Sequence, residues 1–206
     1  MLCAGLAEFG VIVAQGISRI RELIAILTDE SANAVLPPLA RRALAPLVDQ
    51  LIDLQPRIRA LEAELLAWHR QSQESRRLET IPGVGFITAT AIAATVPDPS
   101  LFRSGREFAA WLGLTPRPNA SGGKERLGRI FKMGDGYLRT LLLVGATAVI
   151  RYARTKSAAG TAWISSLLSK KPARLVSVAL ANKTARIAWA LLARGEVYRT
   201  AVVAAA

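Results

Sequence analysis

The clearest periodic pattern in the chain is a series of apolar residues that recur alternately three and four positions apart. It consists of Leu44, Leu47, Leu51, Leu54, Ile58, Leu61, Leu65 and Trp68, with Arg, Asp, Glu and Gln between them. Such a heptad pattern predicts a helix that buries one face against another helix. Pro46 and Pro56 interrupt the pattern. Because proline costs about 3 kcal/mol inside a helix, we expect a kinked coiled-coil arm.

The helix that packs against this arm is not defined by the sequence. Apolar positions in residues 17–24 also fall at helical spacing, and a polar, proline-bearing break over residues 31–38 separates them from the arm. An intramolecular hairpin with residues 15–30 therefore explains the pattern as well as self-association through residues 44–68. We assign residues 1–75 to this helical arm and expect a homo-oligomer.

The remaining residues, 76–206, predict a compact helical domain. Helices are expected over residues 87–96, 104–112, 135–154, 158–169 and 173–194. Ser104 and Glu107 form a capping box at the start of the second of these. Residues 115–133 are rich in proline, glycine and basic side chains, so we expect a loop there. Because strand-like alternation is almost absent, the predicted fold class is all-α.

Composition limits the compartments and scaffolds that the chain could use. Its 206 residues allow one core with an extended arm. No apolar run reaches the roughly 18–20 residues of a membrane span, and the first residues lack the pattern of a signal peptide. The single cysteine, Cys3, excludes a disulfide framework and a cysteine-based zinc site. We therefore expect a cytoplasmic protein that makes no membrane contact.

Charge is distributed unevenly between the two halves. Residues 1–100 carry 9 Lys and Arg against 11 Asp and Glu, whereas residues 101–206 carry 18 against 4, a net of +14. Such asymmetry favours binding to a polyanion, of which nucleic acid is the common one. A basic solvated surface is the alternative. DNA is thus the predicted partner, and association with the nucleoid the predicted location.

Several kinds of catalytic site are missing from the sequence. The basic half has only four acids, and none shows a ligand spacing that would hold a metal ion. The single histidine, His69, ends the arm and is expected at the surface, so we expect no Ser-His-Asp triad. Phosphate-loop and dinucleotide signatures are also absent. We therefore predict no metal site and no cofactor in this chain.

Two glycines, Gly83 and Gly85, lie in the segment Leu78–Phe86, after a pair of arginines and before a predicted helix. Glycines let the backbone turn tightly and bring its N–H groups close to a phosphate at a helix start. The segment resembles the turn of helix-hairpin-helix modules, which grip the DNA backbone. An ordinary turn between helices is the alternative.

A serine, Ser121, lies on a Gly-Gly loop among cationic side chains. These are Arg117, Lys124, Arg126, Arg129, Lys132 and Arg139. The serine could attack a phosphodiester while the cations stabilise the charge that develops on the phosphate. Alternatively, the segment is a basic loop that only contacts DNA phosphates.

Segments Leu78–Gly85, Phe108–Arg117 and Ser121–Arg139 together carry a resemblance that extends beyond each motif. They resemble the carboxy-terminal domain of the IS110 family of insertion-sequence transposases, which are bridge-RNA-guided DNA recombinases. Residues 5–16 also resemble the segment that enters the central coiled coil of this family. The resemblance therefore covers nearly the whole chain.

This resemblance implies a role for Ser121. Family members join an amino-terminal resolvase-like domain, which carries acidic metal ligands, to a domain whose serine attacks the DNA strand. That serine precedes a glycine and is followed by Arg-x-Gly and Lys-x-Gly pairs. In this sequence the corresponding residues are Ser121, then Arg126 with Gly128, and Lys132 with Gly134.

The sequence departs from the family because no segment corresponds to the acidic domain. The metal ligands of the family therefore have no counterpart here, and Mg²⁺ is expected only together with that missing domain. The resemblance also implies a guide RNA as a partner. We expect a truncated form that is inactive on its own.

Three hypotheses about function follow. The chain is a transposase fragment with latent serine chemistry, a non-catalytic helical DNA-binding module, or a dimerisation protein built on the arm. The third predicts no salt-dependent DNA affinity, and the charge asymmetry argues against it. The first two differ only in the role of Ser121.

Overall fold

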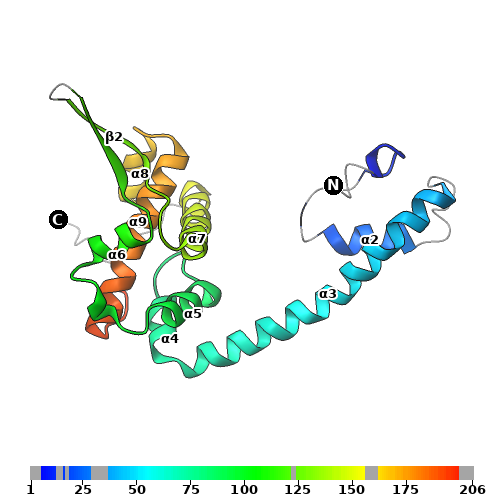
Figure 1. The fold of residues 1–206 in the computed structure, drawn as a ribbon, viewed down its shortest axis with the longest axis horizontal. Helices are drawn as coiled ribbons and strands as arrows, with labels where there is room; N and C mark the ends of the chain where they lie inside the picture. Colours follow the sequence, from blue (N-terminus) through cyan, green and yellow to red (C-terminus); the bar gives the residue numbers. More distant parts are fainter. Residues whose placement is uncertain are drawn as a thin grey trace. The chain divides into compact units, whose positions relative to one another are not determined.

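The computed structural model describes residues 6–12, 16, 19–28, 37–121, 124–155 and 162–199. Its elements are α2 (Ile20–Thr28), α3 (Pro38–Gln71), α4 (Gln73–Glu79), α5 (Phe86–Thr95), the 3₁₀ helix η3 (Pro99–Leu101), α6 (Gly105–Trp111), β1 (Pro116–Ser121), β2 (Lys124–Ile130), α7 (Gly136–Thr155), α8 (Ala162–Leu168) and α9 (Ala173–Arg194). Figure 1 shows that helices make up most of the fold, as the predicted all-α class requires. The chain divides into two units, Met1–Glu64 and Leu65–Ala206.

The first unit has a small apolar cluster around Leu6, which is fully buried. Val11, Ile26 and Leu27 pack against this residue, together with Leu44 and Leu51 of α3. Two positions of the heptad pattern therefore pack within the chain against α2 and the segment before it. The intramolecular interpretation explains this part of the arm.

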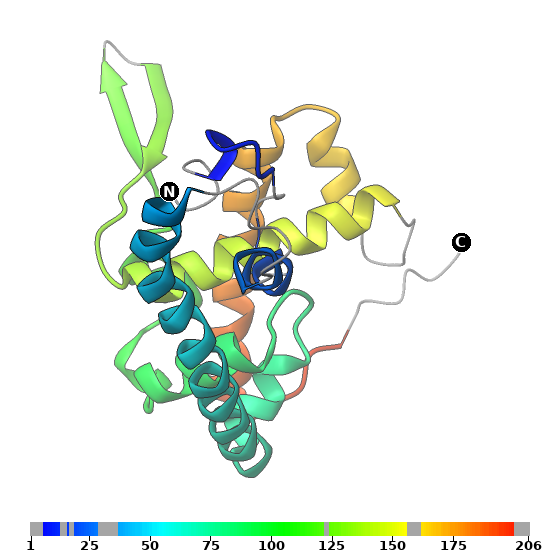
Figure 2. The ribbon, with the colours of Figure 1, turned by 90° about the vertical axis from the view of Figure 1, so that its right-hand side faces the viewer.

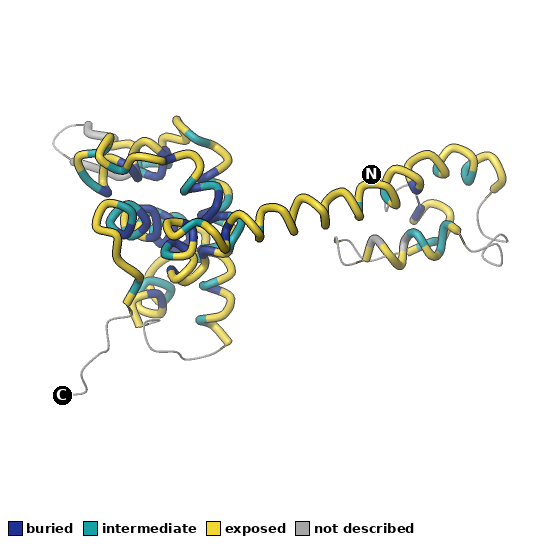
Figure 3. The backbone as a smooth tube through the Cα atoms, turned by 90° about the horizontal axis from the view of Figure 1, so that it is seen from below, coloured by how far each residue is buried: buried dark blue, intermediate teal, exposed yellow. Residues whose placement is uncertain are grey.

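Helix α3 is 34 residues long and continues through Pro46 and Pro56 without a break. Each proline removes one backbone N–H from the helical hydrogen bonds, and the long helix tolerates both losses. Six of the eight heptad positions are exposed: Leu47, Leu54, Ile58, Leu61, Leu65 and Trp68. Figure 3 shows α3 as exposed over most of its length. We call these six residues the α3 stripe.

The second unit is built around α9, which packs against α4, α6, α7 and α8. The helix has the predicted bounds because Pro172 precedes it and Gly195 ends it with a φ of 69°. Its buried residues include Val176, Ala181, Ala185 and Ala188. Among the described residues, α9 is the one helix long and apolar enough to cross a membrane by length and composition, and about two fifths of the window that qualifies is buried in this core.

Helix α4, which the sequence pattern did not predict, surrounds His69 with polar partners. The His69 side chain is 4% exposed, so the prediction of a surface histidine is wrong. Its Nδ1 lies 2.7 Å from the Ser75 hydroxyl, and its Nε2 lies 2.8 Å from Glu79 Oε2. These three side chains form a Ser–His–Glu series, but Ser75 is fully buried and also contacts the Thr90 hydroxyl. The series therefore joins α3, α4 and α5 and is closed to substrates.

Strands β1 and β2 form an antiparallel hairpin where the sequence predicted a loop. The expectation of a loop over residues 115–133 is therefore wrong. The strands pair from Pro116 opposite Ile130 to Ser121 opposite Lys124, with an irregularity between Pro116 and Pro118. Proline lacks a backbone N–H, which is why both fit an edge strand of a two-stranded sheet. Figures 1 and 2 show the hairpin extending away from the helices of its unit.

Candidate nucleic-acid interface

The hairpin carries four of the eight residues that were predicted to contact DNA. Ser121 and Lys124 are the last paired residues at its tip, and Arg126 pairs with Asn119. The side chains of residues 119–127 and the whole of Gly122 and Gly123 lie outside the described part of the structure. Arg117 and Arg129 are exposed. The backbone thus brings the candidate serine and four of the predicted cations onto one projecting element.

Arg117 is held by an aromatic neighbour at the base of the hairpin. Its guanidinium carbon lies 5.1 Å from the centre of the Phe131 ring, and Phe131 donates its backbone N–H to the carbonyl of Thr115. A guanidinium group over an aromatic face keeps its charge while losing freedom of motion. Arg117 is therefore oriented at the surface without a carboxylate partner among the described residues.

Two glycines fix the hairpin to the end of α6. A Cβ atom on Gly134 would overlap the carbonyl oxygen of Trp111, and one on Gly113 would overlap that of Met133. Both glycines have positive φ, at 82° and 69°. Lys132 also has a positive φ, of 57°, and donates its N–H to the Gly113 carbonyl. The Lys-x-Gly pair therefore has a structural role, because only glycine allows this backbone approach.

Arg139 has a more internal position than the other predicted cations. Its Nη1 donates to the carbonyl oxygens of Leu112 and Met133, at 2.9 and 3.1 Å. The guanidinium therefore joins the end of α6 to the segment after β2. A direct contact between Arg139 and a phosphate remains a prediction, and so does DNA contact by the other seven predicted residues.

The described acids near the hairpin are occupied as helix caps. Asp135 accepts the N–H groups of Tyr137 and Leu138 at the start of α7. Glu107 accepts the N–H of Arg103 while Ser104 caps α6. Within the described ranges no three His, Cys, Asp or Glu side chains gather as metal ligands. These acids thus do not fit a metal site.

One further carboxylate, that of Asp98, caps the short helix η3. Hydrogen bonds from the Ser100 side chain and from its backbone N–H lower the pKa of Asp98 below the usual aspartate value. The Asp98 carboxylate, too, is therefore engaged as a helix cap.

The turn with Gly83 and Gly85 lies between α4 and α5, as a helix-hairpin-helix arrangement requires. Gly83 has a φ of 85° and faces the backbone of α7, where its carbonyl oxygen occupies the place that a Cβ of Gly145 would need. Gly85 is the N-cap of α5, and a Cβ there would meet nothing within 4 Å. The two glycines therefore differ: Gly83 is required for packing, and Gly85 leaves the start of α5 open.

The structure contains a second basic surface that was not predicted from the sequence. It is formed by Arg106, Lys183 and Arg186, which come from α6 and α9 and are separated by more than 70 residues along the chain. The sequence of α9 held a signal for it, because Lys183 and Arg186 are three positions apart in the middle of a helix whose other charged residues, Arg174 and Arg194, lie near its ends. Only tertiary packing brings Arg106 to them.

The geometry describes a helical domain with a projecting basic hairpin and a glycine-containing helical turn. Residues 75–160, which include both features, match the model of a family described as Transposase IS116/IS110/IS902 family.

Comparisons with whole proteins extend this similarity over 94% of the chain. It is 45% identical over 195 residues to the transposase y4pF/y4sB of Sinorhizobium fredii, covering 50% of that protein. It is 39% identical over 195 residues to the transposase for insertion sequence element IS1111A of Coxiella burnetii, covering 53% of it. The chain spans about half the length of these curated relatives. The family model and these relatives therefore show what the chain is similar to, transposases of insertion sequences, over the residues that they match.

Proposed function

We propose that this chain binds DNA and contributes the nucleophilic serine, Ser121, to a transposition reaction. The observation that carries the proposal is the similarity to named transposases over 94% of the chain. The position of Ser121 at the tip of a projecting hairpin supports it further. A projecting tip reaches a phosphodiester without requiring DNA to enter the helical core.

In the proposed step the Ser121 hydroxyl oxygen attacks a backbone phosphorus atom. A bond forms between serine and phosphate, one phosphorus–oxygen bond of the DNA breaks, and the leaving oxygen takes up a proton. Cations of the hairpin would stabilise the negative charge of the phosphate during this exchange. A serine hydroxyl is a weak nucleophile until a base or metal activates it.

The activating groups are proposed to come from outside the residues described above. Asp135 and Glu107 cap helices, and they do not fit a metal site. We therefore propose that a separate acidic domain supplies the Mg²⁺ ligands, and that a guide RNA takes part as a further partner. The cytoplasm, in association with the nucleoid, is the proposed location.

The proposal is tested by trapping the covalent intermediate. The full chain is combined with labelled DNA, Mg²⁺, a guide RNA and the acidic domain of a relative, and the products are separated on a denaturing gel. We expect a labelled protein–DNA adduct that Ser121→Ala abolishes, while DNA affinity changes less than about twofold because one hydroxyl is a minor contact. An adduct that survives Ser121→Ala contradicts the proposed nucleophile, and strand cleavage by the chain alone contradicts the need for a second domain.

A second candidate function is a non-catalytic DNA-binding module. The open N-terminus of α5 at Gly85, in a turn between two helices, favours it. Exposed N–H groups at a helix start are suited to a phosphate. This function predicts that the chain binds DNA but forms no covalent protein–DNA adduct under any of the conditions above.

We further propose that the α3 stripe mediates self-association. Five of its six members are large aliphatic residues, and Leu61 is 60% exposed. A row of exposed leucines at heptad spacing is unfavourable in water unless another helix covers it.

A further inference from the structure

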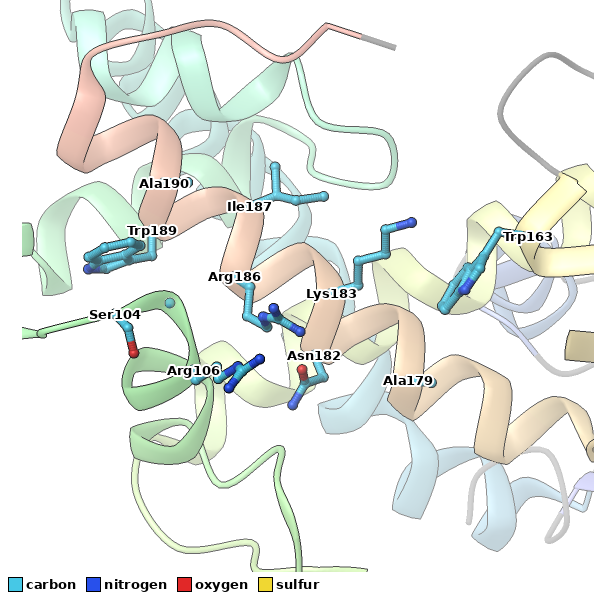
Figure 4. Close-up of a pocket in the computed structure, with 11 residues that line it drawn as sticks. Ser104, Arg106, Trp163, Ala179, Asn182, Lys183, Arg186, Ile187, Trp189 and Ala190 are labelled. Carbon is cyan, nitrogen blue, oxygen red and sulfur yellow. The ribbon is translucent and has the colours of Figure 1, made fainter. Parts of the chain in front are cut away.

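The basic surface on α6 and α9 lines a groove of about 790 Å³, to which α8 contributes Trp163. Lys183, Arg186 and Trp189 follow one another at three-residue spacing along α9, so they share a face of that helix. Figure 4 shows the Arg106 and Arg186 guanidinium groups pointing into the same part of the groove, beside Asn182. The volume lies within the range of about 300–1,000 Å³ that is typical of ligand sites.

The first argument for a ligand is charge. Arg106, Lys183 and Arg186 are exposed, and among the described residues none of them forms an ion pair with a carboxylate. The groove lining contains no acidic residue. Cations that converge without a counter-charge repel one another, and a polyanion relieves this repulsion.

Close backbone packing holds two of these cations together. A Cβ on Gly105 would lie 3.0 Å from the carbonyl oxygen of Arg186 and 3.3 Å from its Cβ. The glycine therefore lets the start of α6 approach α9 at this residue. Arg106, the next residue of α6, is consequently placed beside Arg186, and their proximity is built into the fold.

Aromatic side chains supply the second argument. Trp163 of α8 is 38% exposed, and the Lys183 ammonium lies 4.3 Å from the centre of its ring. At the other end of the groove, the Trp189 ring is fixed because its Nε1 donates to the Pro99 carbonyl at 3.0 Å. Proteins that bind single strands combine a basic groove for phosphates with aromatic rings for unpaired bases. A duplex keeps its bases stacked inside and would offer no unpaired base to the exposed Trp163 ring.

The groove also adjoins the hairpin. Asn182, in the groove lining, donates from Nδ2 to the carbonyl oxygen of Leu114, two residues before β1 begins. A strand in contact with the base of the hairpin would therefore continue directly into the groove.

We propose that this groove binds an unpaired DNA strand, with Arg106, Lys183 and Arg186 at its phosphates and Trp163 stacked on a base. The choice of DNA as the ligand rests on the proposed function. The residues of the groove are different from those of the hairpin. Duplex contact is assigned to the hairpin and single-strand contact to the groove.

The test measures the affinity of the full chain for a fluorescent oligo(dT) 12-mer, an oligo(rU) 12-mer and a 12-base-pair duplex. The groove variant is Arg106→Gln with Arg186→Gln. The control, Arg151→Gln with Arg154→Gln, removes the same charge from exposed positions of α7 outside the groove. We expect the groove variant to weaken oligo(dT) binding about tenfold and duplex binding no more than the control does. The slope of log K against log salt for oligo(dT) should fall by about 1.4, since each single-strand phosphate contact contributes about 0.7.

Trp163 gives an independent readout. Oligo(dT) should quench tryptophan fluorescence in the wild-type chain, and Trp163→Phe should remove most of that quenching while keeping the fold. Equal effects of groove and control variants on oligo(dT) would overturn the proposal, as would tighter binding of oligo(rU) than of oligo(dT). If duplex still binds in those cases, the proposed DNA-binding function stands and only the groove assignment fails. A wild-type chain that binds neither oligo(dT) nor the duplex would contradict both the groove assignment and the proposed DNA-binding function.

Discussion

Gly83 and Gly145 meet backbone to backbone where the turn between α4 and α5 crosses α7. A Cβ on Gly145 would overlap the Gly83 carbonyl, and a Cβ on Gly83 would lie 2.7 Å from Val149 Cγ2. The Cβ on Gly83 would also lie 2.8 Å from the Gly145 carbonyl oxygen, so a movement of the Val149 side chain would not relieve the overlap. The position of the turn, and with it the start of α5, depends on two residues without side chains.

We predict that Gly145→Ala lowers the free energy of unfolding by about 1–3 kcal/mol, as is typical of overpacking. Thermal or urea unfolding followed by circular dichroism measures the change. Gly85→Ala is the matched control and should be close to neutral, because its φ is −90° and its Cβ would face open space. Equal stability of the Gly145 variant and the control would show that the two backbones do not pack as described.

His69 illustrates why single-residue predictions fail when a neighbouring element is missed. The heptad pattern placed it at the end of an exposed arm, and Ser75 and Glu79 were not assigned to any helix. Helix α4 puts both of these on one face, since they are four residues apart, and the histidine ring is enclosed between them. His69 is buried because of where α4 packs in the fold. The only local sequence signal for α4 was its N-cap residue, Ser72.

At the scale of elements, most helices could be read from spacing and caps. Helix α9 matches its predicted bounds, and Ser104 with Glu107 marks the start of α6 as expected. The hairpin could not be read in this way, because Pro116, Pro118 and several glycines suppress strand signals. Its strands pair mainly with each other.

The α3 stripe yields a prediction about assembly. Leu54 is 48% exposed, near the middle of the stripe. If a second copy covers it, Leu54→Asp buries a carboxylate without a partner and should convert the oligomer to a monomer with unchanged helicity. Light scattering gives the mass, and circular dichroism gives the helicity.

Gln50→Asp is the control for this prediction, because it adds the same charge at an exposed position of α3 outside the stripe. It should leave the oligomer intact. A wild-type chain that is already monomeric would contradict self-association and would favour the intramolecular packing of Leu44 and Leu51 around Leu6.

On the scale of the whole molecule, the excess of positive charge belongs to the half that contains the hairpin and the groove. Residues 101–206 carry 18 basic against 4 acidic side chains, and two of those acids, Asp135 and Glu107, are engaged as helix caps. Basic side chains therefore dominate the electrostatic field of this half. Residues 1–100, with 9 basic and 11 acidic side chains, contribute no such attraction. The sequence alone located this asymmetry, whereas the groove needed the fold.

The last prediction follows from this charge distribution. Duplex affinity should fall steeply with salt, because each phosphate contact releases condensed counterions and contributes about 0.9 to the slope of log K against log salt. Arg117→Gln with Arg129→Gln should reduce that slope by about 1.8 if both exposed arginines contact phosphates. Arg57→Gln with Arg59→Gln, which removes equal charge from exposed positions of α3, should leave it nearly unchanged. Fluorescence anisotropy at several salt concentrations measures the slopes. A flat salt response in the wild-type chain, or equal effects of the two variants, would show that the basic half does not direct DNA binding.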